Sequence, residues 1–290
     1  MALSTPAIRL SVLGVVILGV VAFKVVAGNS VEKKLNKIIE KSHNSWSYKS
    51  ASVDLFGGDI HVDGIKIKSA QDNLKIDEVV IHSYDKENEF PQYMNFEVNG
   101  IHITKEFLSQ TRQLAKTVES LGYKNLEANV AINYKINKEK KLFALKELSL
   151  AVGNVGKMDL AVDLYGIDNI NQLLFVAMMP QLVKIGKSSL SYEDDSLVNR
   201  LIKEDGKRRG ISFAENKKRL LSDIQKNIDK YKRKQDIQKV NFLEQMYKFI
   251  ESPKAIKISI NPSSPLSLGV AQKLSDKELK ERLKLKISAE

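Results

Sequence analysis

Residues able to perform chemistry are scattered along this chain, and the patterns they form are incomplete. Gly186-Lys187-Ser188 matches the end of a phosphate-binding P-loop, but Gln181 stands where that loop requires its first glycine. The serine-to-lysine spacing of acyl-transfer enzymes occurs at residues 83–86 and again at residues 30–33, and so short a pattern arises readily by chance. We therefore predict neither a nucleotide site nor a catalytic serine.

Metal ligands are equally sparse. Glu193-Asp194-Asp195 could hold a hard cation, but its position just before an expected helix favours N-capping. The histidines have none of the close spacings of zinc sites, and three of them occupy alternating polar positions of expected strands, which predicts solvent-facing side chains. The four are His43, His61, His82 and His102. Because cysteine is absent as well, we expect no metal site, no cofactor and no enzymatic activity.

Basic residues form the one pattern that points toward a function. The formal net charge is +11, which favours association with an anionic partner such as lipid headgroups or nucleic acid. A solvated helix face is the simplest interpretation of the basic cluster, and contact with anionic headgroups, at about 1 kcal/mol per residue, is the functional one. Nucleic acid is not expected, because aromatic residues do not alternate with the basic ones. The candidate contacts are Lys207, Arg208, Arg209, Lys217, Lys218, Arg219, Lys230, Lys232, Arg233 and Lys234.

The N-terminus predicts a membrane segment. Residues 10–23 carry no charge, and the apolar run resumes after Lys24 and continues to Ala27. At 1.5 Å per residue, about eighteen residues nearly cross a hydrocarbon core of about 30 Å. The predicted anchor, residues 1–28, contains Leu10, Val12, Leu13, Val15, Val16, Ile17, Leu18, Val20, Val21 and Phe23. A cleavable signal peptide with Arg9 in its basic region is the alternative.

The orientation of this segment depends on two opposing signals. Lys33, Lys34, Lys37 and Lys41 follow the segment, whereas Arg9 alone precedes it, and a literal positive-inside count would keep the large domain in the cytoplasm. Long C-terminal domains, however, cross membranes largely regardless of charge. We therefore predict export.

Residues 50–104 alternate with a period of two, which is typical of strands, and we predict strands over 52–56, 59–68, 74–84 and 93–103. Two of these segments resemble each other: Asp59–Ile67 and Asn95–Ile103 share the order apolar, any residue, Val, Asp or Asn, Gly, Ile, any residue, Ile. The apolar positions change parity at the glycine. The Asp-Gly or Asn-Gly pair at this point forms either a type I′ hairpin or a bulge within one long strand, and we favour the bulge because residues 69–73 already supply a turn.

Further along, a helix over 104–121 precedes strands over 126–136, 142–152 and 157–165. The last third changes character. Its apolar segment Asn169–Ile185 predicts a helix bent at Pro180, and Ser212 with Glu215 forms a capping box that opens a long helix, which is either one rod or a helical hairpin. The remaining expected elements are a short strand over 188–192, a helix over 197–209, a strand over 256–260 and a capped helix from residue 275.

The predicted fold class is α+β: an N-terminal transmembrane helix, followed by a curved, mostly antiparallel sheet with packed helices and a helical basic region. The expected boundaries are 1–28 for the membrane anchor or signal segment and 29–49 for a juxtamembrane helix and linker. Residues 50–166 form a β-rich domain with one inserted helix, and residues 167–290 form a mainly helical region to which a strand returns near 254–261.

The segment Val53-Asp54-Leu55-Phe56-Gly57-Gly58-Asp59-Ile60-His61-Val62-Asp63-Gly64-Ile65-Lys66-Ile67, behind a hydrophobic N-terminus, resembles the start of AsmA-like envelope proteins of Gram-negative bacteria. Residues 197–201, 210–212 and 253–265 resemble uncharacterised exported bacterial proteins. The AsmA-like resemblance implies a curved sheet with an apolar concave face, a role in lipid handling or envelope maintenance, and no catalytic residues. Two features depart from it: AsmA-like proteins are usually much longer, and the basic helical region has no counterpart in them.

Two hypotheses of function follow. The first is a non-enzymatic envelope protein that binds lipid or supports envelope maintenance, anchored by a single span in the bacterial inner membrane with its C-terminal domain in the periplasm. The alternative is a scaffold or assembly subunit that binds another envelope protein through its helical region. The expected partners are therefore the membrane, lipid or another envelope protein.

Overall fold

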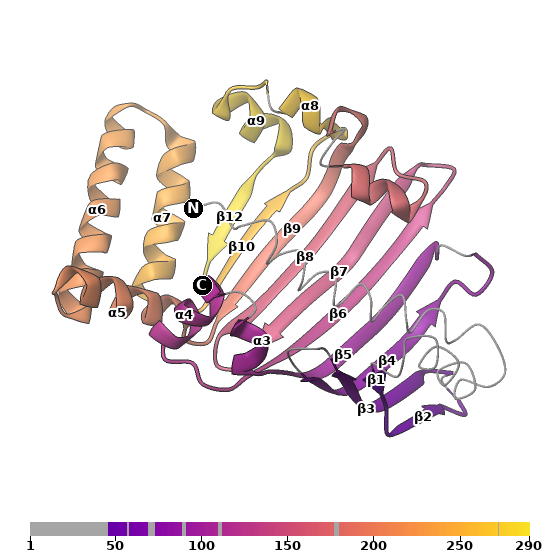
Figure 1. Ribbon diagram of the computed structural model, residues 1–290. Coiled ribbons are helices and arrows are strands. Elements are labelled where there is room, and N and C mark those ends of the chain that lie inside the picture. Colours follow the sequence, from indigo (N-terminus) through magenta and orange to yellow (C-terminus); the bar gives the residue numbers. More distant parts are fainter. Residues whose placement is uncertain are drawn as a thin grey trace. The chain divides into compact units, whose positions relative to one another are not determined.

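The computed structural model describes residues 46–56, 58–68, 73–88, 91–109, 112–176, 180–271 and 273–290 (Figure 1). Its strands pair in the order β1-β3-β4-β5-β6-β7-β8-β9-β10-β12, while β2 pairs with β3 and β11 pairs with β9, giving a twelve-stranded antiparallel sheet. The strands are β1 Trp46–Ser47, β2 Ser50–Val53, β3 Ile60–Lys68, β4 Asn73–Tyr84, β5 Tyr93–Ile103, β6 Leu126–Asn137, β7 Leu142–Val152, β8 Gly156–Tyr165, β9 Lys184–Asp194, β10 Ala255–Ile260, β11 Leu266–Ser267 and β12 Lys286–Ala289.

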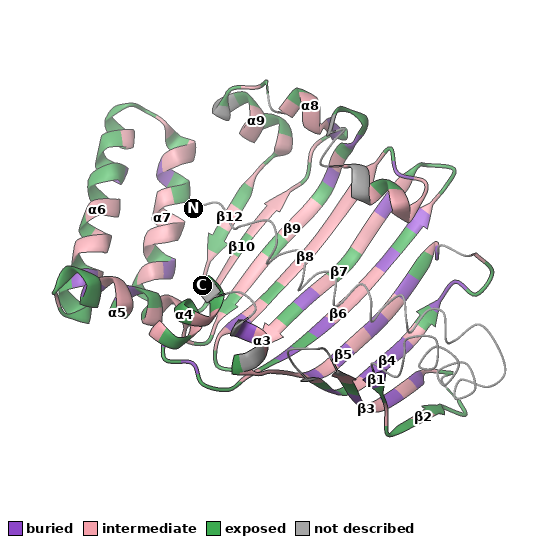
Figure 2. Ribbon diagram, in the orientation of Figure 1, coloured by how far each residue is buried: buried purple, intermediate pink, exposed green. Residues whose placement is uncertain are grey.

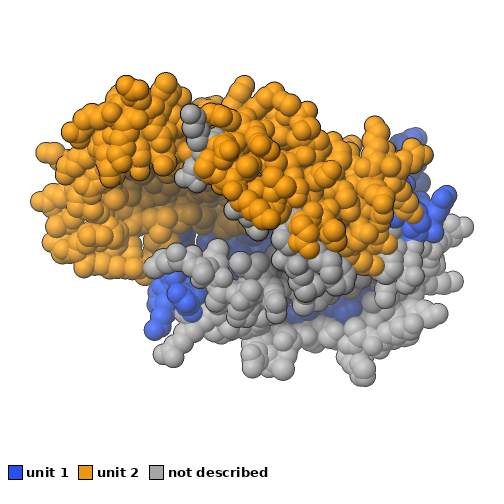
Figure 3. Space-filling model, turned by 90° about the horizontal axis from the view of Figure 1, so that it is seen from above, with its two compact units in different colours: residues 1–119, 123–133 blue, residues 120–122, 134–290 orange. Residues whose placement is uncertain are grey.

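Helices interrupt the strand sequence at four places. The α-helices are α3 Lys105–Ser109, α4 Arg112–Ser120, α5 Leu197–Arg209, α6 Phe213–Arg233, α7 Ile237–Glu251, α8 Leu268–Ala271 and α9 Asp276–Leu283, and the 3-10 helices are η1 Ile170–Phe175 and η2 Pro180–Leu182. The chain divides into two compact units, coloured separately in Figure 3. Unit 1 comprises residues 1–119 and 123–133, and unit 2 comprises residues 120–122 and 134–290.

The predicted α+β fold class and the predicted inner-membrane location are wrong. Across the described ranges, no helix combines the length and the apolar character that crossing a bilayer requires. The predicted single-pass protein of the inner membrane with a periplasmic domain is therefore not supported, and the architecture is a large antiparallel sheet instead of an α+β fold behind a transmembrane helix. The anchor residues from Leu10 to Phe23 lie outside the described residues.

The helix predicted over residues 169–185 is also wrong. Among the described residues of this stretch, 169–176 and 180–185, only the short 3-10 helices η1 and η2 form, and strand β9 has begun by Lys184. Pro180 lacks the backbone N–H that an interior helical position needs, and Gly186 is a poor helix former. Pairing with β8 and β10 instead makes residues 184–194 a full strand, where the sequence predicted strand only over residues 188–192.

In unit 1 the change of apolar parity is shared by three neighbouring strands. Ile60, Ile81 and Phe96 form one buried cross-strand row, and beyond the glycines Ile65 pairs with Ile76. Strand β3 runs without interruption through Gly64, which excludes the hairpin alternative. The register is the same on both sides of Gly64, so the strand is continuous and gains no residue relative to β4. The buried positions change parity at the same level in all three strands.

Gly100 makes this change of parity possible in β5. Its φ is 66°, in the left-handed region, and a Cβ at this position would lie 2.2 Å from Asp77 Oδ2. Its N–H donates to Asn129 Oδ1 at 2.8 Å, so a side chain of β6 supplies an acceptor at the glycine. Both the backbone conformation and the close approach of Asp77 thus require the absence of a side chain.

In unit 2 the strands separate an apolar from a polar sheet face. Leu160, Leu190, Ile258 and Ile287 form one row across β8, β9, β10 and β12. The adjacent row on the opposite face contains Asp159, Ser191, Lys257 and Ser288. Figure 2 shows that most positions on these strands are half-buried, whereas buried residues recur along β4 and β5. This alternation gives each strand one apolar and one polar face, and the apolar row is itself half-buried, with Leu190 exposed.

Replacement of Gly100 with alanine tests whether the change of parity in β5 requires a glycine. Gly100→Ala should lower the free energy of unfolding by about 3 kcal/mol, because it adds the left-handed backbone cost of a side chain to an overlap with Asp77. Gly58→Ala is the matched control: its φ is 73°, but no atom lies within 4 Å of the added Cβ. Urea unfolding should show a loss of only about 1 kcal/mol for the control. Equal losses for the two variants would show that the contact with Asp77 is unimportant.

Candidate functional site

Three helices leave the sheet between β9 and β10, and the candidate basic residues lie on the first two, α5 and α6, with Lys234 at the C-terminal end of α6. The N-cap position of α5 is Ser196, outside the acidic cluster for which N-capping was predicted. Asp194 of that cluster still satisfies one N–H of the first turn, because its Oδ1 accepts from Val198 N at 3.0 Å. Gly210 ends α5 in the left-handed conformation, and the predicted capping box of Ser212 and Glu215 starts α6. Gln235, at φ 56°, separates α6 from α7, so the long helical segment is a hairpin and not a single rod.

A buried polar junction fixes α5 against α6. Asn216 is fully buried, and its Nδ2 donates to Ile202 O at 2.7 Å and to Asp205 Oδ2 at 3.1 Å. Gly206 packs beside it, because a Cβ on that glycine would lie 3.3 Å from Asn216 Cβ. Arg219 completes the junction through an ion pair with Asp205 at 3.2 Å. Every polar atom brought inward here therefore has a partner, as burial requires.

The ten predicted contact residues divide into two groups. Five form ion pairs within the protein: Lys207, Arg208 and Arg209 with acids of α5, Arg219 with Asp205 and Asp223, and Lys232 with Glu244. In the described part of the chain, the other five, Lys217, Lys218, Lys230, Arg233 and Lys234, have no carboxylate within 4.0 Å. The second group is the one able to meet an external anion without first breaking an internal pair.

A shallow groove of about 620 Å³ runs along α6 beside α7. Its apolar part is formed by Phe213, Ala214, Leu221 and Tyr247, and its polar rim by Lys217, Lys218, Ser222, Gln225, Lys226 and Asp229. The lining residues of α6 recur every three or four positions over residues 213–229, which places them on one helix face about 24 Å long. Hereafter these ten residues are called the α6 groove.

Charge is distributed unevenly in the α6 groove. Lys217 stacks on the ring of Phe213, with Nζ 5.7 Å from the ring centroid, and Lys226 pairs with Asp223 at 3.6 Å. Asp229, the one acid among the lining residues, accepts from Gln225 Nε2 at 2.9 Å. The α6 groove is thus an apolar floor with a net positive rim. The sequence predicted Lys217 and Lys218 as contacts but not Lys226 or the apolar floor, to which Tyr247 is contributed by the next helix.

The remaining chemical motifs occupy structural positions. Gly186-Lys187-Ser188 lies inside β9, where no phosphate loop can form, and residues 83–86 lie at the end of β4. Three histidines of unit 1 pair with carboxylates on the polar face of β3, β4 and β5: His61 with Glu78 at 2.8 Å, His82 with Asp59 at 2.8 Å and His102 with Asp77 at 2.9 Å. Among the residues that the structure describes, no cluster of three or more His, Asp or Glu side chains could hold a metal ion.

These pairs shift the titration of two histidines. The hydrogen bond from Glu78 raises the pKa of His61, and the same bond lowers the pKa of Glu78. Partial burial lowers the pKa of His82, but Asp59 and Glu97 outweigh it, so the net shift is upward. Because Glu78 lies opposite Asp63 in the ladder and beside His61, the strand register brings the pair together.

The pair of His61 and Glu78 predicts a pH-dependent contribution to stability. A histidine whose pKa is raised in the folded state stabilises the fold at pH values below its ordinary pKa of about 6.5. This stabilisation is lost as the pH rises through the folded-state pKa. Glu78→Gln should therefore cost up to about 1 kcal/mol at about pH 5.5 and less at about pH 8.5. The loss at the lower pH should be accompanied by a drop in the His61 pKa, measured by NMR titration of the imidazole.

The exposed residue Glu87 provides the control for this experiment. Glu87→Gln removes the same charge from unit 1 outside the pair and should leave the His61 titration unchanged. A variant series in which Glu78→Gln and Glu87→Gln alter the His61 pKa equally would contradict the local origin of the shift.

The chain is similar to proteins that are described only as uncharacterised. A family model with the description "Uncharacterized protein" matches residues 147–290. An uncharacterised protein of Aquifex aeolicus (strain VF5) is 24% identical over 256 residues, which cover 83% of this chain and 81% of that protein. Neither description names an AsmA-like protein or a lipid, so the predicted description as an AsmA-like, lipid-binding membrane protein is without support and is not carried further.

Proposed function

We propose that this chain is a non-enzymatic interaction protein that binds an acidic amphipathic helix of a partner protein in the α6 groove. The observation that carries the proposal is the combination of an apolar floor with two rim lysines, Lys217 and Lys218, that have no acidic partner among the described residues. A helix that carries apolar residues at every third or fourth position and acids beside them complements both features.

Charge concentration supports this proposal. Residues 197–251 contain fifteen Lys and Arg and eight Asp and Glu, a net charge of +7 within a chain whose total is +11. Such a local excess attracts an acidic partner and accelerates its association at low ionic strength. The excess lies on α5 and α6, which carry most of the charged candidates on exposed positions, whereas α7 has no net charge.

The rigidity of the helical region supports it as well. Asn216 and the ion pair of Arg219 with Asp205 hold α5 and α6 together, and Asp194 N donates to Lys254 O at 2.7 Å where the helices leave and rejoin the sheet. A groove on a preorganised surface loses less conformational entropy on binding than a groove on mobile segments. The length of the α6 groove, about 24 Å, accommodates about four turns of a partner helix.

The test uses a fluorescently labelled peptide of about 18 residues with leucines on one helical face and glutamates beside them, titrated with the full chain and followed by fluorescence anisotropy. We expect saturable binding. Lys217→Glu with Lys218→Glu should weaken binding about tenfold, since two attractive charges become repulsive. Leu221→Asp should weaken it similarly by placing a charge on the apolar floor.

Two controls separate site binding from general electrostatics. Lys138→Glu with Lys140→Glu changes the net charge equally at two exposed positions of the β6–β7 turn and should leave the affinity unchanged. Vesicles of phosphatidylcholine and phosphatidylglycerol serve as the competing anionic surface. The proposal is wrong if both double variants weaken peptide binding equally, or if the chain binds vesicles and not the peptide.

A further inference from the structure

Strand β12 is the last strand of the sheet order and leaves one backbone edge exposed. Glu290 N donates to Ala255 O at 3.0 Å, so in this antiparallel register Ser288 and Lys286 are also hydrogen-bonded to β10. The N–H and C=O of Ile287 consequently point away from β10. Ala289 N points the same way and donates to Gln245 Oε1 of α7 at 2.9 Å. Within the described chain, no strand lies beside Ile287 on that side.

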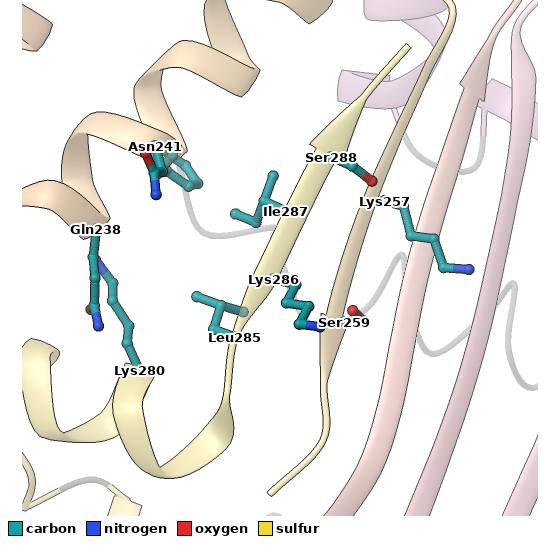
Figure 4. Close-up of a pocket in the computed structure, with 10 residues that line it drawn as sticks. Gln238, Asn241, Lys257, Ser259, Lys280, Leu285, Lys286, Ile287 and Ser288 are labelled. Atoms are coloured by element: carbon teal, nitrogen blue, oxygen red, sulfur yellow. The ribbon is translucent and has the colours of Figure 1, made fainter.

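A cavity of about 460 Å³ lies at this edge between α7, α9 and β12. Figure 4 shows Leu285 and Ile287 pointing toward α7, whereas Ser288 and Lys257 point to the opposite sheet face. The cavity is lined by Gln238 of α7 and by Lys280 of α9. Its volume lies within the range of about 300–1,000 Å³ for small-ligand pockets, so it admits only a few residues of a polypeptide.

The two faces beside this edge have opposite character. The helix-facing side contains the apolar residues Phe242, Leu285 and Ile287. Of these, Ile287 continues the apolar row of Leu160, Leu190 and Ile258. The other side offers Lys257 and Lys286, with Ser259 and Ser288 between them. No acid lines the cavity, and Lys257, Lys280 and Lys286 have no carboxylate of the described residues within 4.0 Å.

We infer that the edge of β12 is a strand-addition site for a short extended segment of a partner protein in which apolar and acidic residues alternate. The backbone of that segment pairs with Ile287. Its apolar side chains extend the row that ends at Ile287, and its carboxylates face Lys257 and Lys286 on the other side. An alternating segment is required because successive side chains of a strand point to opposite faces.

The test uses full-length protein and a labelled heptapeptide that alternates glutamate and valine, with binding followed by fluorescence anisotropy. We expect saturable binding that Lys257→Glu with Lys286→Glu weakens about tenfold. Lys217→Glu with Lys218→Glu, which lies in the α6 groove, should leave the affinity unchanged, as should Lys138→Glu with Lys140→Glu. A failure of the heptapeptide to bind would therefore not contradict the proposed function of the α6 groove. A failure of the helical peptide to bind would likewise not contradict strand addition at β12.

Modified peptides make the inference falsifiable without altering the protein. In strand addition, only the N–H groups along one edge of the peptide bond to the protein. N-methylation of the alternate residues on that edge should therefore abolish binding, whereas N-methylation of the other set of alternate residues should preserve it. A heptapeptide of equal composition with its glutamates and valines in separate blocks should bind at least about tenfold more weakly, because it cannot place both residue types on their own faces. Equal binding of both N-methylated peptides, or of the block peptide, overturns the inference.

Discussion

Antiparallel pairing between neighbouring strands is the interaction on which the rest of this structure depends. It fixes which side chains share a row, and therefore which face of each strand packs and which meets solvent. The change of parity in unit 1 illustrates the constraint. If the apolar positions changed parity in β3 alone, its apolar residues would pair with polar residues of β4, but β4 and β5 change at the same level and the rows stay matched.

The helical region is inserted into this pairing without disturbing it. Residue Glu193 pairs directly with Ala255, so β9 and β10 are adjacent although three helices separate them in sequence. The hydrogen bond from Asp194 N to Lys254 O joins the two ends of the insertion, and Asp194 Oδ1 also accepts from Val198 N in the first turn of α5. Sheet pairing thus anchors both ends of a helical excursion whose outer surface is free to carry charge.

Charge and register together define the two proposed binding surfaces in unit 2. On α6, helical periodicity places apolar residues between lysines, and α7 supplies Tyr247 to complete the floor. On β12, strand periodicity places Ile287 and Lys286 on opposite faces. Both surfaces favour acidic partners because internal carboxylates neutralise only some of the basic residues. Arg219 differs from the unpaired lysines, because its guanidinium is already engaged by Asp205 of α5 and by Asp223 of α6.

Periodicity and capping made much of this structure predictable from the sequence. Strands β3 to β8, the helix over 197–209 and the two capping boxes at Ser212 and Ser275 follow from signals contained within a few adjacent residues. The sequence also located the basic cluster. It did not predict β12, whose four residues have too short a pattern, or the strand character of Lys184, which depends on pairing with β8 and β11.

Only the tertiary structure decided which residues of the candidate surfaces are available for binding. Lys217 and Arg219 are near neighbours of the same chemical kind, yet Arg219 is engaged by Asp205, fourteen residues away. The edge position of β12 likewise depends on where the chain returns to the sheet after α9. Local patterns are set by backbone geometry over one or two turns, whereas ion pairing, strand register and exposed edges depend on contacts between distant residues, which no short stretch of sequence specifies.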